Sequence, residues 1–138
     1  MLDKPIIGII GKVQPKYDED LWHRIDETDE IRYLIVKNGG IAMMLLPTEP
    51  TLKFNDNDIK DNTKLTQEEL EDLDRQIKLF DGFILQGGLY SCNYEIEIAK
   101  RVLEYNKPLL GICAGFNNIL RAIRNRCIIR WNEKTWSL

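Results

Sequence analysis

The stretch from Lys107 to Asn118 reads Lys-Pro-Leu-Leu-Gly-Ile-Cys-Ala-Gly-Phe-Asn-Asn. A short apolar run ends in Gly111-Ile112, a cysteine follows, and an apparent helix opens at Ala114. This order predicts a strand, a sharp turn and a helix, with Cys113 at the turn and a glycine two residues to either side. The same plan builds the nucleophile elbow of hydrolases. Small residues suit such a turn because bulky side chains would collide with the neighbouring strand and helix.

Two interpretations of Cys113 follow from this pattern. At the N-terminus of a helix, the backbone dipole and the free N–H groups favour an anion, which suits a reactive thiolate. The alternative is a buried cysteine at an ordinary strand–helix junction, since free cysteine is often a core residue. The pattern G-x-C-x-G is short, so it leaves both interpretations open.

Strand-like and helix-like segments alternate along the whole chain. Apolar runs typical of buried parallel strands occupy residues 5–11, 41–46, 81–86 and 108–112. Helical periodicity follows them over residues 21–38, 66–77, 93–105 and 114–123, and Thr66 with Glu69 forms a capping-box pattern. The alternation predicts an α/β fold with a doubly wound, mostly parallel sheet and flanking helices, of the flavodoxin-like kind.

Three further segments carry structural expectations. The polar segment Lys12–Asp20 contains a proline and is expected to be a loop. Thr48–Lys64 has few apolar residues and is expected to be a long surface loop that lines a site. In the helix after Cys113, a buried face is expected, made of Phe116, Ile119, Leu120 and Ile123.

Composition narrows the classes of function. The chain has 138 residues, a formal net charge of -3 and 43% hydrophobic residues, which is typical of a single globular domain rather than a nucleic-acid-binding protein. No apolar run reaches the length of a membrane span, and the N-terminus lacks the features of a signal peptide. The three cysteines, Cys92, Cys113 and Cys127, form no C-x-x-C pair. We therefore expect a cytoplasmic protein with neither a metal site nor a cofactor, and with no membrane or nucleic-acid partner.

The ends of two predicted strands suggest a site for chemistry. Gly87-Gly88 and Cys113 each follow a strand, and ligands of open parallel sheets bind at the carboxyl ends of the strands. The N–H of Ala114 is a natural donor to an oxyanion at Cys113, and Gly88 offers a second backbone N–H. The alternative for Gly87-Gly88 is a plain turn between a strand and a loop.

No residue is an evident general base for Cys113. His23 is the only histidine, and a solvated position before the first helix is expected for it, with an approach to the elbow in space as the alternative. For Glu95 we expect a solvated carboxylate in the first turn of a helix, with a position facing the site as the alternative. Cys92, in the loop after Gly87-Gly88, is expected to be an incidental thiol, with a position near Cys113 as the alternative.

Three stretches together resemble a known family. Ile6-Ile7-Gly8-Ile9, the segment Asp81–Gly88 and the segment Lys107–Asn117 occur in the order and at the separations of the class I glutamine amidotransferase superfamily. The chain is most similar to the gamma-glutamyl-gamma-aminobutyrate hydrolase-like branch, over roughly residues 5–123. The resemblance implies hydrolysis of a small gamma-glutamyl amide through a thioester. It implies Cys113 as nucleophile, an oxyanion hole from Gly88 and Ala114, and substrate contacts from Gly87 and Asn117.

The sequence departs from the family pattern at three places. Gln86 replaces a common proline, Asn117 replaces the usual glutamine, and no histidine follows Cys113 to complete a triad with a glutamate. Residues 124–138 form an atypical tail, so we expect one partial domain over residues 1–138 that is truncated after the elbow helix. Such a domain would leave a sheet edge and apolar helix faces uncovered, which predicts a homodimer through that edge.

Three functional hypotheses are compatible with the sequence. The first is a thiol hydrolase of gamma-glutamyl amides, impaired because the triad histidine and glutamate are missing. The second is a non-catalytic binding or assembly module that keeps the fold and pocket. The third keeps a reactive elbow cysteine for another task, as in related proteins of the redox-chaperone type.

Overall fold

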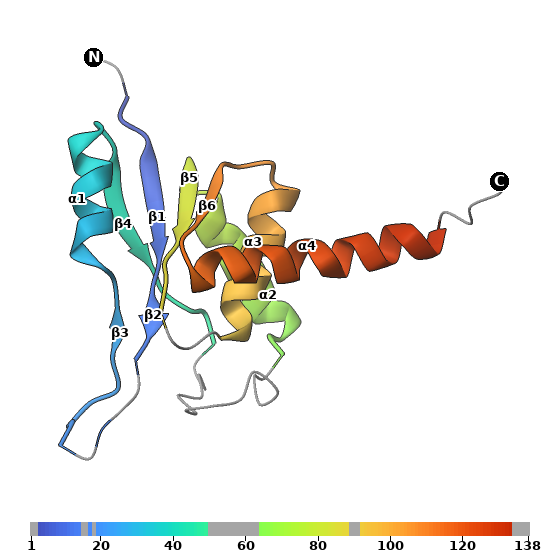
Figure 1. Ribbon diagram of the computed structural model, residues 1–138, viewed down its shortest axis with the longest axis horizontal. Helices are drawn as coiled ribbons and strands as arrows, with labels where there is room; N and C mark the ends of the chain where they lie inside the picture. The colour runs from blue at the N-terminus through green and yellow to red at the C-terminus, as the bar shows by residue number, and fades with distance from the viewer. Residues whose placement is uncertain (1–2, 15–16, 18, 50–63, 89–91, 134–138) are drawn as a thin grey trace.

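The computed structural model describes residues 3–14, 17, 19–49, 64–88 and 92–133. Figure 1 shows a central sheet with helices on both faces, and α4 running past the end of the sheet. The elements in chain order are β1 (Ile6–Ile10), β2 (Lys12–Val13), β3 (Ile25–Asp26), α1 (Asp29–Lys37), β4 (Ile41–Leu45), α2 (Gln67–Ile77), β5 (Gly82–Leu85), α3 (Asn93–Glu104), β6 (Leu109–Gly111) and α4 (Ala114–Glu133).

Four strands form one parallel sheet in the order β4-β1-β5-β6. The register pairs Ile10 of β1 with Leu45 of β4 and with Leu85 of β5, and pairs Leu85 in turn with Gly111 of β6. The carboxyl ends of all four strands therefore lie at the same end of the sheet. The α/β fold with a mostly parallel, flavodoxin-like sheet is confirmed.

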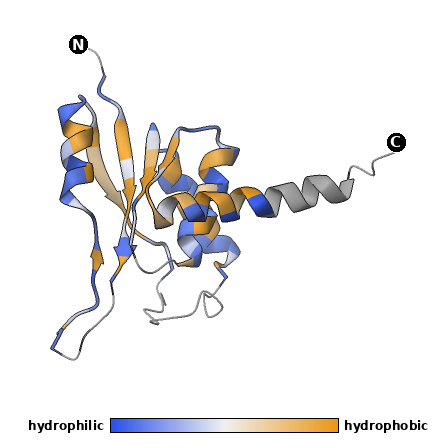
Figure 2. Ribbon diagram, viewed as in Figure 1, coloured by the Kyte–Doolittle hydropathy of each residue, from blue (hydrophilic) through white to orange (hydrophobic). Residues whose placement is uncertain are grey.

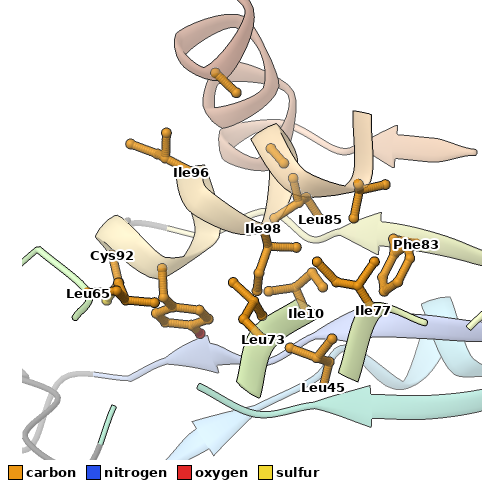
Figure 3. Close-up of a cluster of buried hydrophobic side chains, with 14 of the residues drawn as sticks. Ile10, Leu45, Leu65, Leu73, Ile77, Phe83, Leu85, Cys92, Ile96 and Ile98 are labelled. Atoms are coloured by element: carbon orange, nitrogen blue, oxygen red, sulfur yellow. The ribbon is translucent and has the colours of Figure 1, made fainter. Parts of the chain in front are cut away.

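Side chains of β1 alternate between the two faces of the sheet, as a strand requires. On one face, Ile9 packs against Ile31 and Ile35 of α1. On the other face, Ile10 belongs to a larger core that α2, α3 and α4 cover. Figure 3 shows the side chains of α2 and α3 directed onto the sheet in this larger core, whose members include Leu45, Leu73, Ile77, Phe83, Leu85 and Ile98.

The sequence signals for α2 and α3 are confirmed. The Glu69 backbone N–H donates to Thr66 Oγ1 at 3.2 Å, and the Thr66 N–H donates to Glu69 Oε2 at 2.7 Å, which completes the predicted capping box. Ile98 and Val102 of α3 are fully buried, as their spacing predicted. Among the described residues, no helix is both long enough and apolar enough to cross a bilayer.

Two predictions about the first third of the chain are wrong. Lys12 and Val13 are not loop residues: they form β2, which pairs antiparallel with β3. Because that hairpin occupies Ile25–Asp26, the first helix begins at Asp29 rather than near Leu21. Of the predicted surface loop Thr48–Lys64, residues 50–63 lie outside the described part of the chain.

The predicted buried face of α4 is confirmed for Ile119, which is partly buried against the large core, and is wrong for its other three members. Phe116, Leu120 and Ile123 are 52%, 47% and 39% exposed, whereas Asn118 and Ala122 are fully buried. The reason is the close approach of α4 to the sheet, because a Cβ at Gly115 would lie 2.0 Å from the carbonyl oxygen of Leu85. The small residues of the helix therefore face inward together with Ile119, and the three exposed residues face outward. Figure 2 shows hydrophobic positions along this first half of α4.

Candidate active site

Cys113 lies at the turn between β6 and α4, and its backbone is strained. Its φ is +51°, in the left-handed region that a non-glycine residue rarely adopts. Such a conformation costs on the order of 1 kcal/mol or more and occurs often at functional sites. The side chain is exposed, which excludes the alternative of a buried core cysteine.

The two glycines around Cys113 are required by close packing. A Cβ at Gly111 would lie 2.6 Å from backbone atoms of Phe116, and one at Gly115 would overlap the backbone of Leu85. Cβ atoms essentially never approach other atoms this closely. The turn can therefore form only with glycine at both positions, as the G-x-C-x-G pattern predicts for an elbow.

The turn after β5 lies against Cys113. A Cβ at Gly87 would be 3.2 Å from Cys113 Cβ and 4.0 Å from its Sγ. Gly88 has a φ of +151°, a conformation open to glycine but strained for other residues. The structure thus brings the Gly87-Gly88 turn to Cys113, which follows Gly88 by 25 residues in the sequence.

Two other predicted site residues lie on the first turns of α4. Ala114 is the first residue of the helix, so its N–H has no acceptor within the helix. Asn117 is exposed one turn later, and its backbone N–H donates to the Cys113 carbonyl oxygen at 3.2 Å. Ala114 is therefore the residue next to Cys113, and Asn117 lies one helical turn beyond it.

The expectation of a solvated Glu95 is wrong. Its side chain is only 1% exposed and accepts a hydrogen bond from Lys12 Nζ at 2.8 Å. Its second carboxylate oxygen accepts the backbone N–H of Cys92 at 2.6 Å. Burial raises the pKa of the Glu95 carboxyl, and the charge of Lys12 opposes that rise.

Cys92 differs sharply from Cys113 in its surroundings. It is 6% exposed and belongs to the large core, where Figure 3 shows it beside Leu65. Burial, reinforced by the charge of Glu95, raises the pKa of the Cys92 thiol to about 12. Cys92 is therefore a protonated thiol at neutral pH, which agrees with its prediction as incidental.

Gln86 has a structural task that the sequence did not reveal. Its Nε2 donates to the carbonyl oxygens of Ile10 at 2.9 Å and Asp26 at 2.8 Å. Its Oε1 accepts the Thr28 backbone N–H at 2.9 Å and the Thr28 hydroxyl at 3.2 Å. The buried amide thus fastens β1, β3 and the start of α1 to the exit of β5. In the sequence, the one indication of this structural role was the position of a polar residue between an apolar run and two glycines.

His23 lies in the segment between β2 and β3, two residues before β3 begins. In Figure 1 this hairpin extends away from the start of α4. No three His, Cys, Asp or Glu side chains in the described ranges group as a metal site requires.

A comparison with protein families bears on this geometry. Residues 50–134, more than half of the chain, match the family model "Glutamine amidotransferase class-I". The chain belongs to the class I glutamine amidotransferase family. The matched segment includes the Gly87-Gly88 turn, the elbow and all of α4 in this amidotransferase domain. No curated protein sequence matches the chain.

Proposed function

We propose that this amidotransferase-like chain is a thiol hydrolase whose substrate is a small gamma-glutamyl amide. The Cys113 sulfur attacks the amide carbonyl carbon and forms a C–S bond, and the carbonyl electrons move onto oxygen. When the C–N bond breaks, the amine or ammonia leaves with a proton, and a gamma-glutamyl thioester remains on Cys113. Water then hydrolyses the thioester to glutamate and the free thiol.

One observation carries this proposal: an exposed cysteine, held at a φ of +51° at a helix N-terminus, with the Gly87-Gly88 turn packed against it. We propose that the backbone N–H groups of Gly88 and Ala114 bind the oxyanion. Ala114 is bonded directly to Cys113, and Gly88 follows Gly87, which contacts Cys113. Gly87 and Asn117 are proposed to contact the substrate. The gamma-glutamyl-gamma-aminobutyrate hydrolase-like branch is our proposal for the closest chemistry.

The general base of a thiol hydrolase is commonly a histidine beside the cysteine. The sequence contains one histidine, His23, and it lies in the β2–β3 hairpin. We therefore propose that acylation of Cys113 is faster than hydrolysis of the thioester, so that turnover is impaired. We place this reaction in the cytoplasm, with no cofactor.

The placement of His23 also supports a second candidate, a binding or assembly module that holds a gamma-glutamyl compound without acylation. A chromogenic amide, gamma-glutamyl p-nitroanilide, separates the two. A burst of up to one p-nitroaniline per chain, absent in Cys113→Ser, supports the hydrolase. Calorimetric binding of glutamine without any burst supports the binding module and contradicts the hydrolase.

A further inference from the structure

A buried ion pair lies beneath the Gly87-Gly88 turn. Lys12 Nζ and Glu95 Oε1 are 2.8 Å apart, and the two side chains are 3% and 1% exposed. Burying two charges removes their hydration, and an apolar pair of similar size often stabilises a fold as well or better. The pair therefore calls for a role beyond stability.

Lys12 supports the turn from below with its aliphatic stem. A Cβ at Gly88 would lie 2.9 Å from Lys12 Cε and 3.3 Å from its Cγ, so the backbone of Gly88 sits directly on the stem. The ammonium group at the end of the stem reaches across to α3. Lys12 itself is fixed in β2, directly after the carboxyl end of β1.

Glu95 holds the other end of the same connection. It is in the first turn of α3, and its Oε2 accepts the N–H of Cys92 at 2.6 Å, where the connection from β5 enters the helix. The ion pair thus contacts the segment between β5 and α3 at Gly88 and again at Cys92. Through Gly87, the residue before Gly88, the same segment also touches Cys113.

We infer that Lys12 and Glu95 are positioning residues that act as one unit to hold the Gly87-Gly88 turn against Cys113. This inference rests on the proposed function, in which the N–H of Gly88 must face the oxyanion that forms at the thiol. Removing either charge leaves the other buried without its partner and releases the stem of Lys12 from α3. The turn then loses its support while the elbow itself is unchanged.

The variants Lys12→Met and Glu95→Gln test the inference, because each removes one charge and nearly preserves size. The matched control is Lys100→Met, which breaks the partly exposed Lys100–Glu97 pair on the same helix. The readout is the rate constant for acylation by gamma-glutamyl p-nitroanilide divided by that for alkylation by iodoacetamide at Cys113. Alkylation needs no oxyanion hole, so a change in the reactivity of the Cys113 thiol alone leaves this ratio unchanged. The variants are compared under conditions in which circular dichroism shows each of them folded, because an unfolded chain is still alkylated but is not acylated.

We expect Lys12→Met and Glu95→Gln each to lower the ratio about tenfold or more, since one oxyanion donor contributes about 10²–10³ in rate. The double variant should fall no further than the lower single variant, because the two residues act as a unit. The control should stay within about twofold of the unaltered chain. Equal losses in both rate constants, or a multiplied loss in the double variant, would overturn the inference.

A second measurement does not depend on acylation. Amide hydrogen exchange of the peptide that contains Gly87 and Gly88 should accelerate in Lys12→Met and Glu95→Gln, and not in Lys100→Met. If the unaltered chain shows no burst, the proposed function fails, and exchange alone decides the positioning role. Unchanged exchange in both variants refutes that role even where the burst is present.

Discussion

Gly115 is the residue whose replacement tests the elbow most severely. On an open helix face, Gly→Ala stabilises a protein by up to about 1 kcal/mol, because alanine is the better helix former. At Gly115 the added Cβ would lie 2.0 Å from the carbonyl oxygen of Leu85 and 2.5 Å from its carbonyl carbon. These are backbone atoms of β5, inside the sheet, and they cannot rotate away as a side chain does.

The expected cost follows from these two opposing effects. Overpacking a well-packed site costs about 1–3 kcal/mol, and a clash with strand backbone belongs at the upper end or beyond. After subtracting the gain in helix propensity, Gly115→Ala should lower the free energy of unfolding by about 2–3 kcal/mol. Urea unfolding followed by circular dichroism measures this change.

Gly39→Ala provides the matched control. Gly39 has a φ of +85°, and a Cβ there would meet nothing within 4 Å, so only backbone strain of about 1 kcal/mol is expected. The rate constant for alkylation of Cys113 by iodoacetamide should change in Gly115→Ala and stay constant in Gly39→Ala. If Gly115→Ala is as stable as the unaltered chain, or more so, the close contact between α4 and β5 is refuted.

Three further predictions concern the cysteines and the open edge of the sheet. At pH 7.5, about one pH unit below the pKa of a free thiol, iodoacetamide should alkylate Cys113 and spare Cys92. Peptide mapping checks this, and equal labelling of the two cysteines in the native state would contradict it. Because burial raises the pKa of Cys92 from 9.0 to about 12 and that of Tyr94 well above 10.0, the folded state prefers both protonated. Stability should therefore be full below pH 9.0 and fall as pH rises toward 12, and a flat profile in urea unfolding across this range opposes it. Finally, we expect a homodimer through β6 and the outward face of α4, where Phe116 and Leu120 are 52% and 47% exposed. Sedimentation should show dimers for the unaltered chain and monomers for Leu120→Glu. Monomers of the unaltered chain at micromolar concentration would contradict this expectation.

Local sequence was sufficient to predict those parts of the fold that depend on interactions between residues close together in the chain. Uninterrupted apolar runs identified all four strands of the main sheet, and the pair Thr66 and Glu69 located the start of α2. The spacing of Gly111, Cys113 and Gly115 predicted the elbow, because steric exclusion at a tight turn acts between near neighbours and a single adjacent strand. These signals depend little on the rest of the molecule.

Such local signals could not predict the ion pair between Lys12 and Glu95 or the orientation of α4. Lys12 and Glu95 are 83 residues apart, and each looks like an ordinary surface charge in its own segment. The periodicity of α4 offered a bulky face, yet the contact between Gly115 and Leu85 turns the small face inward. Long-range packing decided both, and only the assembled sheet brings the partners together.

The proposed function requires that Cys113 attack the carbonyl carbon of a gamma-glutamyl amide. Its most direct measurement is mass spectrometry of the chain after reaction with gamma-glutamyl p-nitroanilide and a rapid acid quench. We expect one gamma-glutamyl group per chain, on the peptide that contains Cys113, removable by hydroxylamine and absent from Cys113→Ala. An unmodified chain at saturating amide, in a preparation whose Cys113 still reacts with iodoacetamide, would contradict it.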